Sequence, residues 1–266
     1  MLLSPVMRKP ALPTAPVAVT PALRHLSSTP LPLPDRVGSP ALLGIDAAGR
    51  VAVELLYGAD SADCWLAQYV FSADGTPLDQ RDEAYGHNPH FAPFDLADFS
   101  LDRPETAEAV QPLIFAGGRW RGLRETDRVP DVLHPLTVAE KIEFTALGLP
   151  GNLLGVVESQ VLAMVAINMD WLLLCRRVRL AYVTPYSRDA DGTPFDYDSC
   201  AVHFVQWLPR QADDAGSQPL PQLMRDSRAM FGAQPTDLLY NPQWQRLYLI
   251  DNGTPTEPAL LHIFAI

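Results

Sequence analysis

Cysteine is scarce in this chain of 266 residues, which contains only Cys64, Cys175 and Cys200. Three cysteines cannot all pair with one another, and their wide spacing matches neither a disulfide framework nor a zinc-binding motif. The sequence therefore argues against disulfide-stapled small folds and the common zinc modules. Cys64 and Cys175 lie within apolar runs, which predicts that both side chains belong to the core.

Long apolar runs are also lacking. The longest, residues 161–175, is interrupted by Asn168 and Asp170, whereas a helix that crosses a membrane needs about 20 apolar residues. The first forty residues lack the apolar segment of a secretory signal, because nine prolines interrupt them. These observations predict that the protein has no membrane partner and is cytoplasmic.

Basic residues are few: 20 lysines and arginines stand against 31 aspartates and glutamates, for a net charge of −11. Residues 1–40 are proline-rich, carry +3 and are expected to form an extended arm or linker. Residues 41–266 carry −14 and are expected to form a single β-rich domain. Such a negative field repels nucleic acids and attracts basic proteins. The charge predicts a basic protein partner; the alternative is that the acidity serves only solubility.

Catalytic motifs are missing as well. The chain has no Gly-x-Ser-x-Gly elbow, no glycine-rich phosphate loop and no dinucleotide fingerprint. Cys200 and His203 are close in sequence, as a thiol nucleophile and its base would be. Their odd separation on an expected strand, however, places the two side chains on opposite faces of a sheet. The sequence therefore argues against a thiol nucleophile.

Turn sequences, by contrast, are prominent. An Asp or Asn followed by Gly-Thr-Pro occurs three times, at residues 74–77, 191–194 and 252–255. Asp-Gly and Asn-Gly favour tight reversals, and the proline that follows suits a strand edge. All three segments are therefore predicted to be hairpin tips, although their uneven spacing does not establish an internal repeat.

Strand patterns flank these turns. Apolar residues alternate over residues 51–57, whereas residues 64–71 are apolar at nearly every position, which predicts a strand buried on both faces. The chain ends in another apolar pattern, residues 260–266, and such a strand often completes a sheet begun near the N-terminus. The patterns predict a mainly β fold of antiparallel meander sheets, either propeller-like or a sandwich or barrel.

Two short helices are expected within this β fold. Thr137 and Glu140 have the spacing of a capping box, and they predict a helix over residues 137–147. Apolar residues at helical spacing predict a second helix over residues 221–231.

The segment richest in carboxylates is a candidate calcium site. Calcium prefers six to eight oxygen ligands, and a glycine permits the sharp bend between them. The segment lacks the closing glutamate of an EF-hand loop, so a hairpin tip with acids in water is the alternative. The expectation is that the protein has no cofactor, with calcium at this segment as the alternative. The candidate ligands are Asp189, Asp191, Asp196 and Asp198.

A second candidate site contains His87 and His90. Two imidazoles three residues apart could bind a metal or act as acid and base from a loop. Pro89 between them argues against the helix that would align them, and no third ligand follows at a recognisable spacing.

A third candidate is a protein-binding surface. Tryptophan and arginine are enriched where proteins bind one another. Trp120, which lies between Arg119 and Arg121, and Trp244 are the tryptophans expected to be exposed.

These features favour a non-catalytic acidic binding protein, such as an immunity-type inhibitor of a basic toxin. The alternative is a hydrolase or metal-assisted enzyme that uses His87, His90 and the loop of residues 189–198. The sequence does not indicate the oligomeric state.

Overall fold

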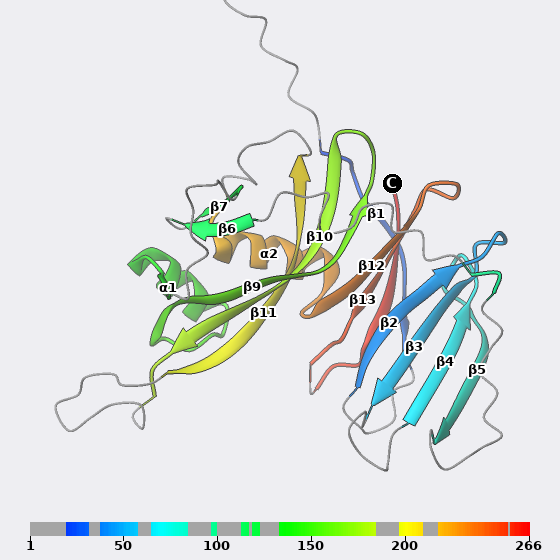
Figure 1. Cartoon of the computed structure of the whole chain (residues 1–266), viewed down its shortest axis with the longest axis horizontal. Coiled ribbons are helices and arrows are strands. Elements are labelled where there is room, and N and C mark those ends of the chain that lie inside the picture. Colours follow the sequence, from blue (N-terminus) through cyan, green and yellow to red (C-terminus); the bar gives the residue numbers. More distant parts are fainter. Residues whose placement is uncertain are drawn as a thin grey trace, which may run out of the picture.

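The computed structural model describes residues 20–31, 38–57, 65–84, 97–99, 113–116, 119–122, 133–184, 197–209, 218–254 and 256–266. Over these residues the fold is mainly β, with antiparallel sheets and two short helices (Figure 1), as the sequence predicts. Among the described strands no sheet closes into a barrel, because each four-stranded sheet has two edge strands.

Three four-stranded sheets form the framework, and Figure 1 shows one of them between the other two. The middle one, the terminal sheet, consists in order of β1 (Arg24–Pro30), β14 (Leu260–Ala265), β13 (Arg246–Asp251) and β12 (Pro235–Asn241). The meander sheet consists of β2 (Gly38–Ile45), β3 (Val51–Tyr57), β4 (Trp65–Phe71) and β5 (Pro77–Ala84). The long-strand sheet consists of β11 (Asp198–Pro209), β10 (Trp171–Tyr182), β9 (Leu153–Ala166) and β8 (His134–Pro135). A separate hairpin contains β6 (Leu113–Ala116) and β7 (Arg119–Gly122).

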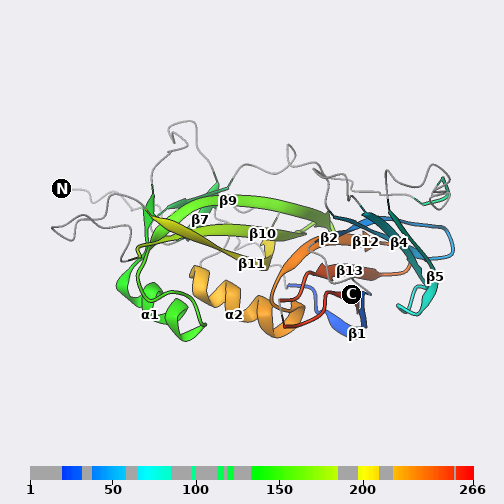
Figure 2. The ribbon, with the colours of Figure 1, turned by 90° about the horizontal axis from the view of Figure 1, so that it is seen from below.

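The two helices, α1 (Val138–Ala146) and α2 (Leu220–Phe231), lie where the sequence predicts them. The capping box of α1 is formed: Glu140 N donates to Thr137 Oγ1 at 3.2 Å, and Thr137 N donates to the Glu140 carboxylate at 2.9 Å. Figure 2 shows both helices on the same side of the long-strand sheet. Among the described residues, no helix has the length and apolar character needed to span a membrane.

The first predicted hairpin tip is formed: Gly75 joins β4 to β5 at φ +88°, in the left-handed region that favours glycine. The third predicted tip, residues 252–255, belongs to the longer connection between β13 and β14, residues 252–259. Gly253 has φ +68° there, and backbone hydrogen bonds between Thr254 and Glu257 close the reversal, while Pro255 lies outside the described residues. Residues 191–194 lie outside the described residues. The strand predicted to be buried on both faces is confirmed, because every side chain from Leu66 to Phe71 is buried.

The first and last described strands pair with each other, which confirms that the C-terminal strand completes a sheet begun near the N-terminus. β1 runs antiparallel to β14, from Arg24 opposite Ala265 to Pro30 opposite Leu260. β1 belongs to the proline-rich stretch predicted as an extended arm, so this part of the stretch is an edge strand of the terminal sheet.

Three clusters of buried apolar side chains hold the sheets together. The first lies between the long-strand sheet and the helices, the second between the meander and terminal sheets, and the third between the long-strand and terminal sheets. Alternate residues of β10 enter the first and third clusters, because successive strand side chains point to opposite faces. Buried members include Phe144, Phe204 and Met224 in the first cluster, Phe71 and Tyr248 in the second, and Leu173, Cys175 and Phe264 in the third.

Candidate functional site

Most of the predicted metal and catalytic residues lie outside the described residues: His87, His90, Asp189, Asp191 and Asp196. Asp198 is the exposed first residue of β11. Among the described residues no group of three or more His, Cys, Asp or Glu side chains could hold a metal ion. The calcium site and the histidine site therefore stay predictions.

Of the predicted partner-binding residues, Trp244 is 40% exposed. It lies in the turn between β12 and β13, and its indole packs directly against Gly49 in the turn between β2 and β3. Arg119, Trp120 and Arg121 belong to β7, whose side chains are outside the described part. Partner binding by Trp120 and by Trp244 stays a prediction.

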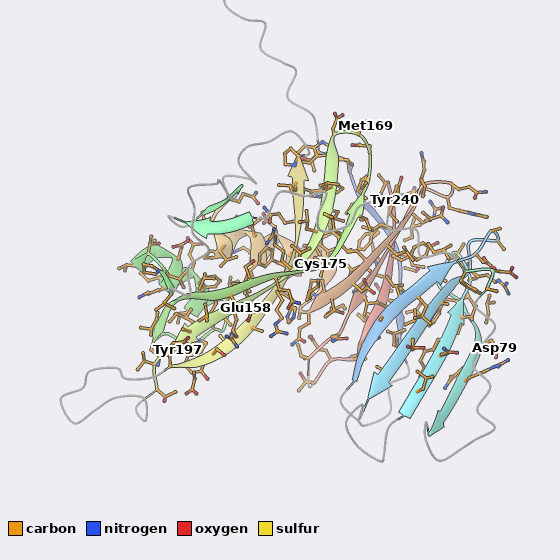
Figure 3. The ribbon with its side chains drawn as sticks, in the orientation of Figure 1. Asp79, Glu158, Met169, Cys175, Tyr197 and Tyr240 are labelled. Carbon is orange, nitrogen blue, oxygen red and sulfur yellow. The ribbon has the colours of Figure 1, made fainter. Side chains whose placement is uncertain are left out.

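The outer strand of the meander sheet, β5, is acidic and open on one side. β5 pairs with β4 on one side only, and no described strand pairs with its other side. Residues 77–81 are all exposed, and Figure 3 shows Asp79 at the outer margin of the molecule. Residues 77–84 contain three acids and one arginine. We call this strand the β5 edge.

An apolar cavity of about 480 Å³ adjoins the β5 edge. Its walls come from β1, β4 and β5, so it lies where the terminal and meander sheets meet. Leu78 in its wall is 53% exposed, so its apolar side chain is accessible to a partner. The lining residues are Pro30, Tyr69, Phe71, Pro77, Leu78, Asp79 and Gln80.

Hydrogen bonds from β1 fix the hairpin that carries the β5 edge. Ser27 Oγ donates to the carbonyl oxygen of Asp74 at 2.8 Å, and Thr29 Oγ1 donates to that of Gly75 at 2.7 Å. Hydrogen bonds from the Ser72 hydroxyl and from Thr76 hold the pKa of the Asp74 carboxyl below its usual value. The turn is therefore anionic at neutral pH and firmly positioned beside the cavity.

A second cavity, of about 490 Å³, lies at the junction of the three sheets, and we call it the junction cavity. Arg177 of β10 and His203 of β11 lie directly opposite each other in the long-strand sheet and both line it. The remaining walls come from β2, β9, β12 and two adjoining loop residues. They are Pro40, Ala41, Leu162, Gln234, Thr236, Asp237 and Asn252.

The electrostatics of the junction cavity depend on Arg177 and His203. Burial, reinforced by the positive charge of Arg177, lowers the pKa of His203, while the carboxylate of Asp251 partly opposes this shift. His203 is therefore neutral at pH 7. Within the described part of the chain, Arg177 forms no hydrogen bond or ion pair through its guanidinium. A cationic, half-buried side chain thus faces the cavity beside a neutral imidazole.

The lowered pKa of His203 predicts a dependence of stability on pH. The unfolded chain, with a His pKa near 6.5, binds a proton at a higher pH than the folded protein does. The free energy of unfolding is therefore expected to fall as the pH drops below about 6.5, and His203→Gln should make this fall smaller. Urea denaturation of both proteins at pH 7, 6 and 5 measures this pH dependence. An identical change of the free energy of unfolding with pH in both proteins would contradict the lowered pKa of His203.

Asp251 connects the end of β13 to the segment that follows α2. Its buried carboxylate accepts hydrogen bonds from the backbone N–H groups of Ala233 at 3.1 Å, Gln234 at 2.8 Å and Gly253 at 3.0 Å. Burial alone would raise the pKa of this carboxyl, but the His262 ring and the backbone donors outweigh it and hold the pKa below its usual value. Asp251 is thus ionised at neutral pH.

A chain of polar side chains leads from Asp251 to the surface. His262 Nε2 lies 3.9 Å from the Asp251 carboxylate, and His262 Nδ1 lies 2.8 Å from Ser28 Oγ. Ser28 Oγ in turn lies 2.7 Å from His25 Nε2. Since 3.9 Å is too long for a hydrogen bond, Asp251 acts on His262 only through its charge. The chain fastens the edge strand β1 to β14.

The two remaining sequence predictions about cysteines can be compared with the fold. Cys175 is buried in the core, as predicted, and donates to the carbonyl oxygen of Pro235 at 2.9 Å. Cys64 lies outside the described residues. Cys200 packs against the cluster beneath the helices, whereas His203 lines the junction cavity on the opposite face of β11. The predicted separation of Cys200 and His203 is confirmed, and no thiol–imidazole pair forms.

Compared with protein-family models, with curated protein sequences and with solved structures, the chain matches none of them. The geometry and chemistry of its own residues are thus the basis for any inference about function. Two places stand out among the described residues: the β5 edge with its apolar cavity, and the junction cavity with Arg177.

Proposed function

We propose that this protein is a non-catalytic acidic binding protein, and that a basic protein docks on its β5 edge. The observation that carries the proposal is the combination of an acidic strand, open on its outer side among the described strands, with an adjoining apolar cavity. A net charge of −11 gives the whole molecule the same preference.

Each part of the β5 edge supplies a different contribution to binding. An open strand edge offers backbone N–H and C=O groups to an added strand of the partner, which supplies affinity. Asp79 and its acidic neighbours attract lysine and arginine, which mainly raises the association rate and selects basic partners. The cavity of about 480 Å³ beside Leu78 accepts an apolar side chain of the same partner segment.

The narrower form of the proposal is that the protein is an immunity-type inhibitor of a basic toxin such as a nuclease, acting in the cytoplasm. A nuclease presents a basic surface because it binds nucleic acid, and an acidic protein strand can occupy that surface. The same negative charge disfavours nucleic acid as the partner of this protein.

Binding to a panel of small basic ribonucleases and deoxyribonucleases, measured by calorimetry at low and high salt, tests the proposal. At least one is expected to bind, with an affinity that falls about tenfold or more at high salt. Reversing the charge of the β5 edge should weaken that binding by about tenfold or more. The variant is Asp79→Lys/Asp82→Lys/Glu83→Lys.

A matched control changes the net charge equally at acids of the long-strand sheet and α2, which the terminal sheet separates from β5 (Figure 1). It is expected to weaken binding less than about threefold, because exposed charges separated by more than a Debye length are screened. Equal losses in both variants would show that net charge, and not the β5 edge, determines binding. The absence of binding to every member of the panel would overturn the proposed class of partner. The control variant is Asp170→Lys/Asp198→Lys/Asp226→Lys, at exposed positions.

A further inference from the structure

We infer that the junction cavity is a binding site for a small organic molecule with one carboxylate group, and that Arg177 holds this carboxylate. The inference does not depend on the β5 edge, because the two cavities share no lining residue. The volume of about 490 Å³ lies within the range typical of small-molecule sites, which is about 300 to 1,000 Å³.

Arg177 is the anchor of the proposed site. Its neighbour Arg179, two residues along the same face of β10, is paired with Glu158 at 3.5 Å. Arg177 has no such carboxylate among the described residues, although it is only partly exposed and lines the cavity. A guanidinium is always charged and presents its N–H donors in a plane that matches the two oxygens of a carboxylate. A ligand carboxylate would supply the partner that Arg177 lacks.

The charges around the cavity favour a carboxylate over a phosphate. Asp237 lines the same cavity, and Asp251 is close enough to influence the pKa of His203. With His203 neutral, Arg177 is the only cationic side chain among the described residues of the cavity wall. A phosphate monoester carries nearly two negative charges at pH 7, so one guanidinium would leave it undercompensated beside two carboxylates. A single carboxylate matches the single guanidinium.

The rest of the wall indicates the other end of the ligand. Pro40, Ala41 and Leu162 contribute apolar surface from β2 and β9. Gln234 and Thr236 contribute polar groups on the side of β12. An apolar surface with a few convergent polar groups is typical of a small-molecule site. The cavity therefore fits a monocarboxylic acid with a short apolar chain.

Calorimetry with straight-chain monocarboxylic acids from acetate to octanoate, each compared with its primary amide, tests the inference. At least one acid is expected to bind saturably, and its amide, which has the same shape without the charge, at least about tenfold more weakly. Inorganic phosphate is measured in parallel and should bind more weakly than the best acid. No saturable binding of any acid, or tighter binding of phosphate, would overturn the inference.

Arg177→Met is expected to weaken the binding of the best acid by about tenfold or more while leaving the binding of its amide unchanged. Arg179→Met is the matched control on the same strand and should leave the affinity within about twofold. Equal effects of the two variants would place the ligand elsewhere. Ala41→Trp, at an exposed position of the cavity wall, should weaken the binding of both the acid and its amide because the indole fills the cavity. If Arg177→Met does not fold, this variant tests whether the ligand binds in the junction cavity.

Discussion

Gly232→Ala is expected to lower the free energy of unfolding by about 4 kcal/mol. Gly232 ends α2 with φ +92° and ψ −168°, a combination that is essentially confined to glycine. A methyl group there would also overlap the carboxylate of Asp251, which is held in place by three backbone N–H donors. The carboxylate cannot move away from the methyl group without losing its hydrogen bonds to the backbone. The strain therefore cannot relax without a further loss of free energy. Urea denaturation followed by circular dichroism measures the change.

Gly148→Ala is the matched control, because Gly148 has a similar φ of +86° but no atom of the described residues within 4 Å of an added Cβ. It should cost only about 1 kcal/mol, the penalty for the left-handed conformation alone. Gly232→Ala should also cost about 1 to 2 kcal/mol less in an Asp251→Ala background, where the overlap is gone. Equal costs of Gly232→Ala and Gly148→Ala would show that the contact with Asp251 is unimportant.

Asp251→Ala is expected to lower the free energy of unfolding by about 3 kcal/mol at pH 7. The substitution leaves the N–H groups of Ala233, Gln234 and Gly253 without their acceptor, and the cost of a buried unpaired donor is larger than the gain from a hydrogen bond. Asp198→Ala, at an exposed position, should change the stability by less than about 0.5 kcal/mol. Urea denaturation of the three proteins checks both values.

The pH dependence identifies the charge of Asp251 as the cause. A carboxyl whose folded pKa lies below its unfolded value of about 3.9 stabilises the protein above that pH, and the contribution is lost as the pH falls through the folded pKa. The difference in the free energy of unfolding between the wild type and Asp251→Ala should therefore become smaller as the pH falls from 5 to 3. A difference that stays constant over this range would mean that only packing was lost.

The parts of the fold that depend on neighbouring residues could be predicted from the sequence. The capping box of Thr137 and Glu140 predicts the start of α1, because both partners lie within four residues. Asp74 and Gly75 predict the tight turn between β4 and β5 for the same reason, whereas the reversal after Gly253 is closed by Thr254 and Glu257, farther along the chain. The apolar run before Gly75 predicts a strand buried on both faces, since a sequence apolar at every position has no face suited to water.

The arrangement of the sheets could not be predicted, because it depends on contacts between distant segments. β1 is an edge strand whose side chains are exposed at most positions. Its sequence, Arg24–Pro30, therefore needs no alternation of apolar and polar residues, which is the pattern that identifies a half-buried strand. Its partner β14 is recognisable as a strand, but nothing local indicates which strand lies beside it. The period of the hydrophobic pattern predicts whether a segment is a helix or a strand. Which strands pair depends on how the whole fold buries their apolar faces.

The junction cavity could not be predicted from the sequence either, because its residues are also distant from one another in the chain. Arg177 and His203 are 26 residues apart and come together only through the register of β10 and β11. The available signal was three arginines, at positions 176, 177 and 179, within an otherwise apolar strand pattern, which suggests either an exposed edge or buried partners. Asp251 likewise resembles an ordinary turn residue next to Asn252 and Gly253, and only the fold reveals its three backbone donors.

The pairing of β1 with β14 has a consequence for how the protein is made. Ser28 and its neighbour His262 are separated by 234 residues in the chain. At a synthesis rate of roughly 5 to 20 residues per second, β1 waits roughly 12 to 50 seconds for the strand that it joins. The meander sheet can assemble during that interval, but the terminal sheet cannot. Synthesis of β14 is therefore the event that allows β1 to pair in the terminal sheet.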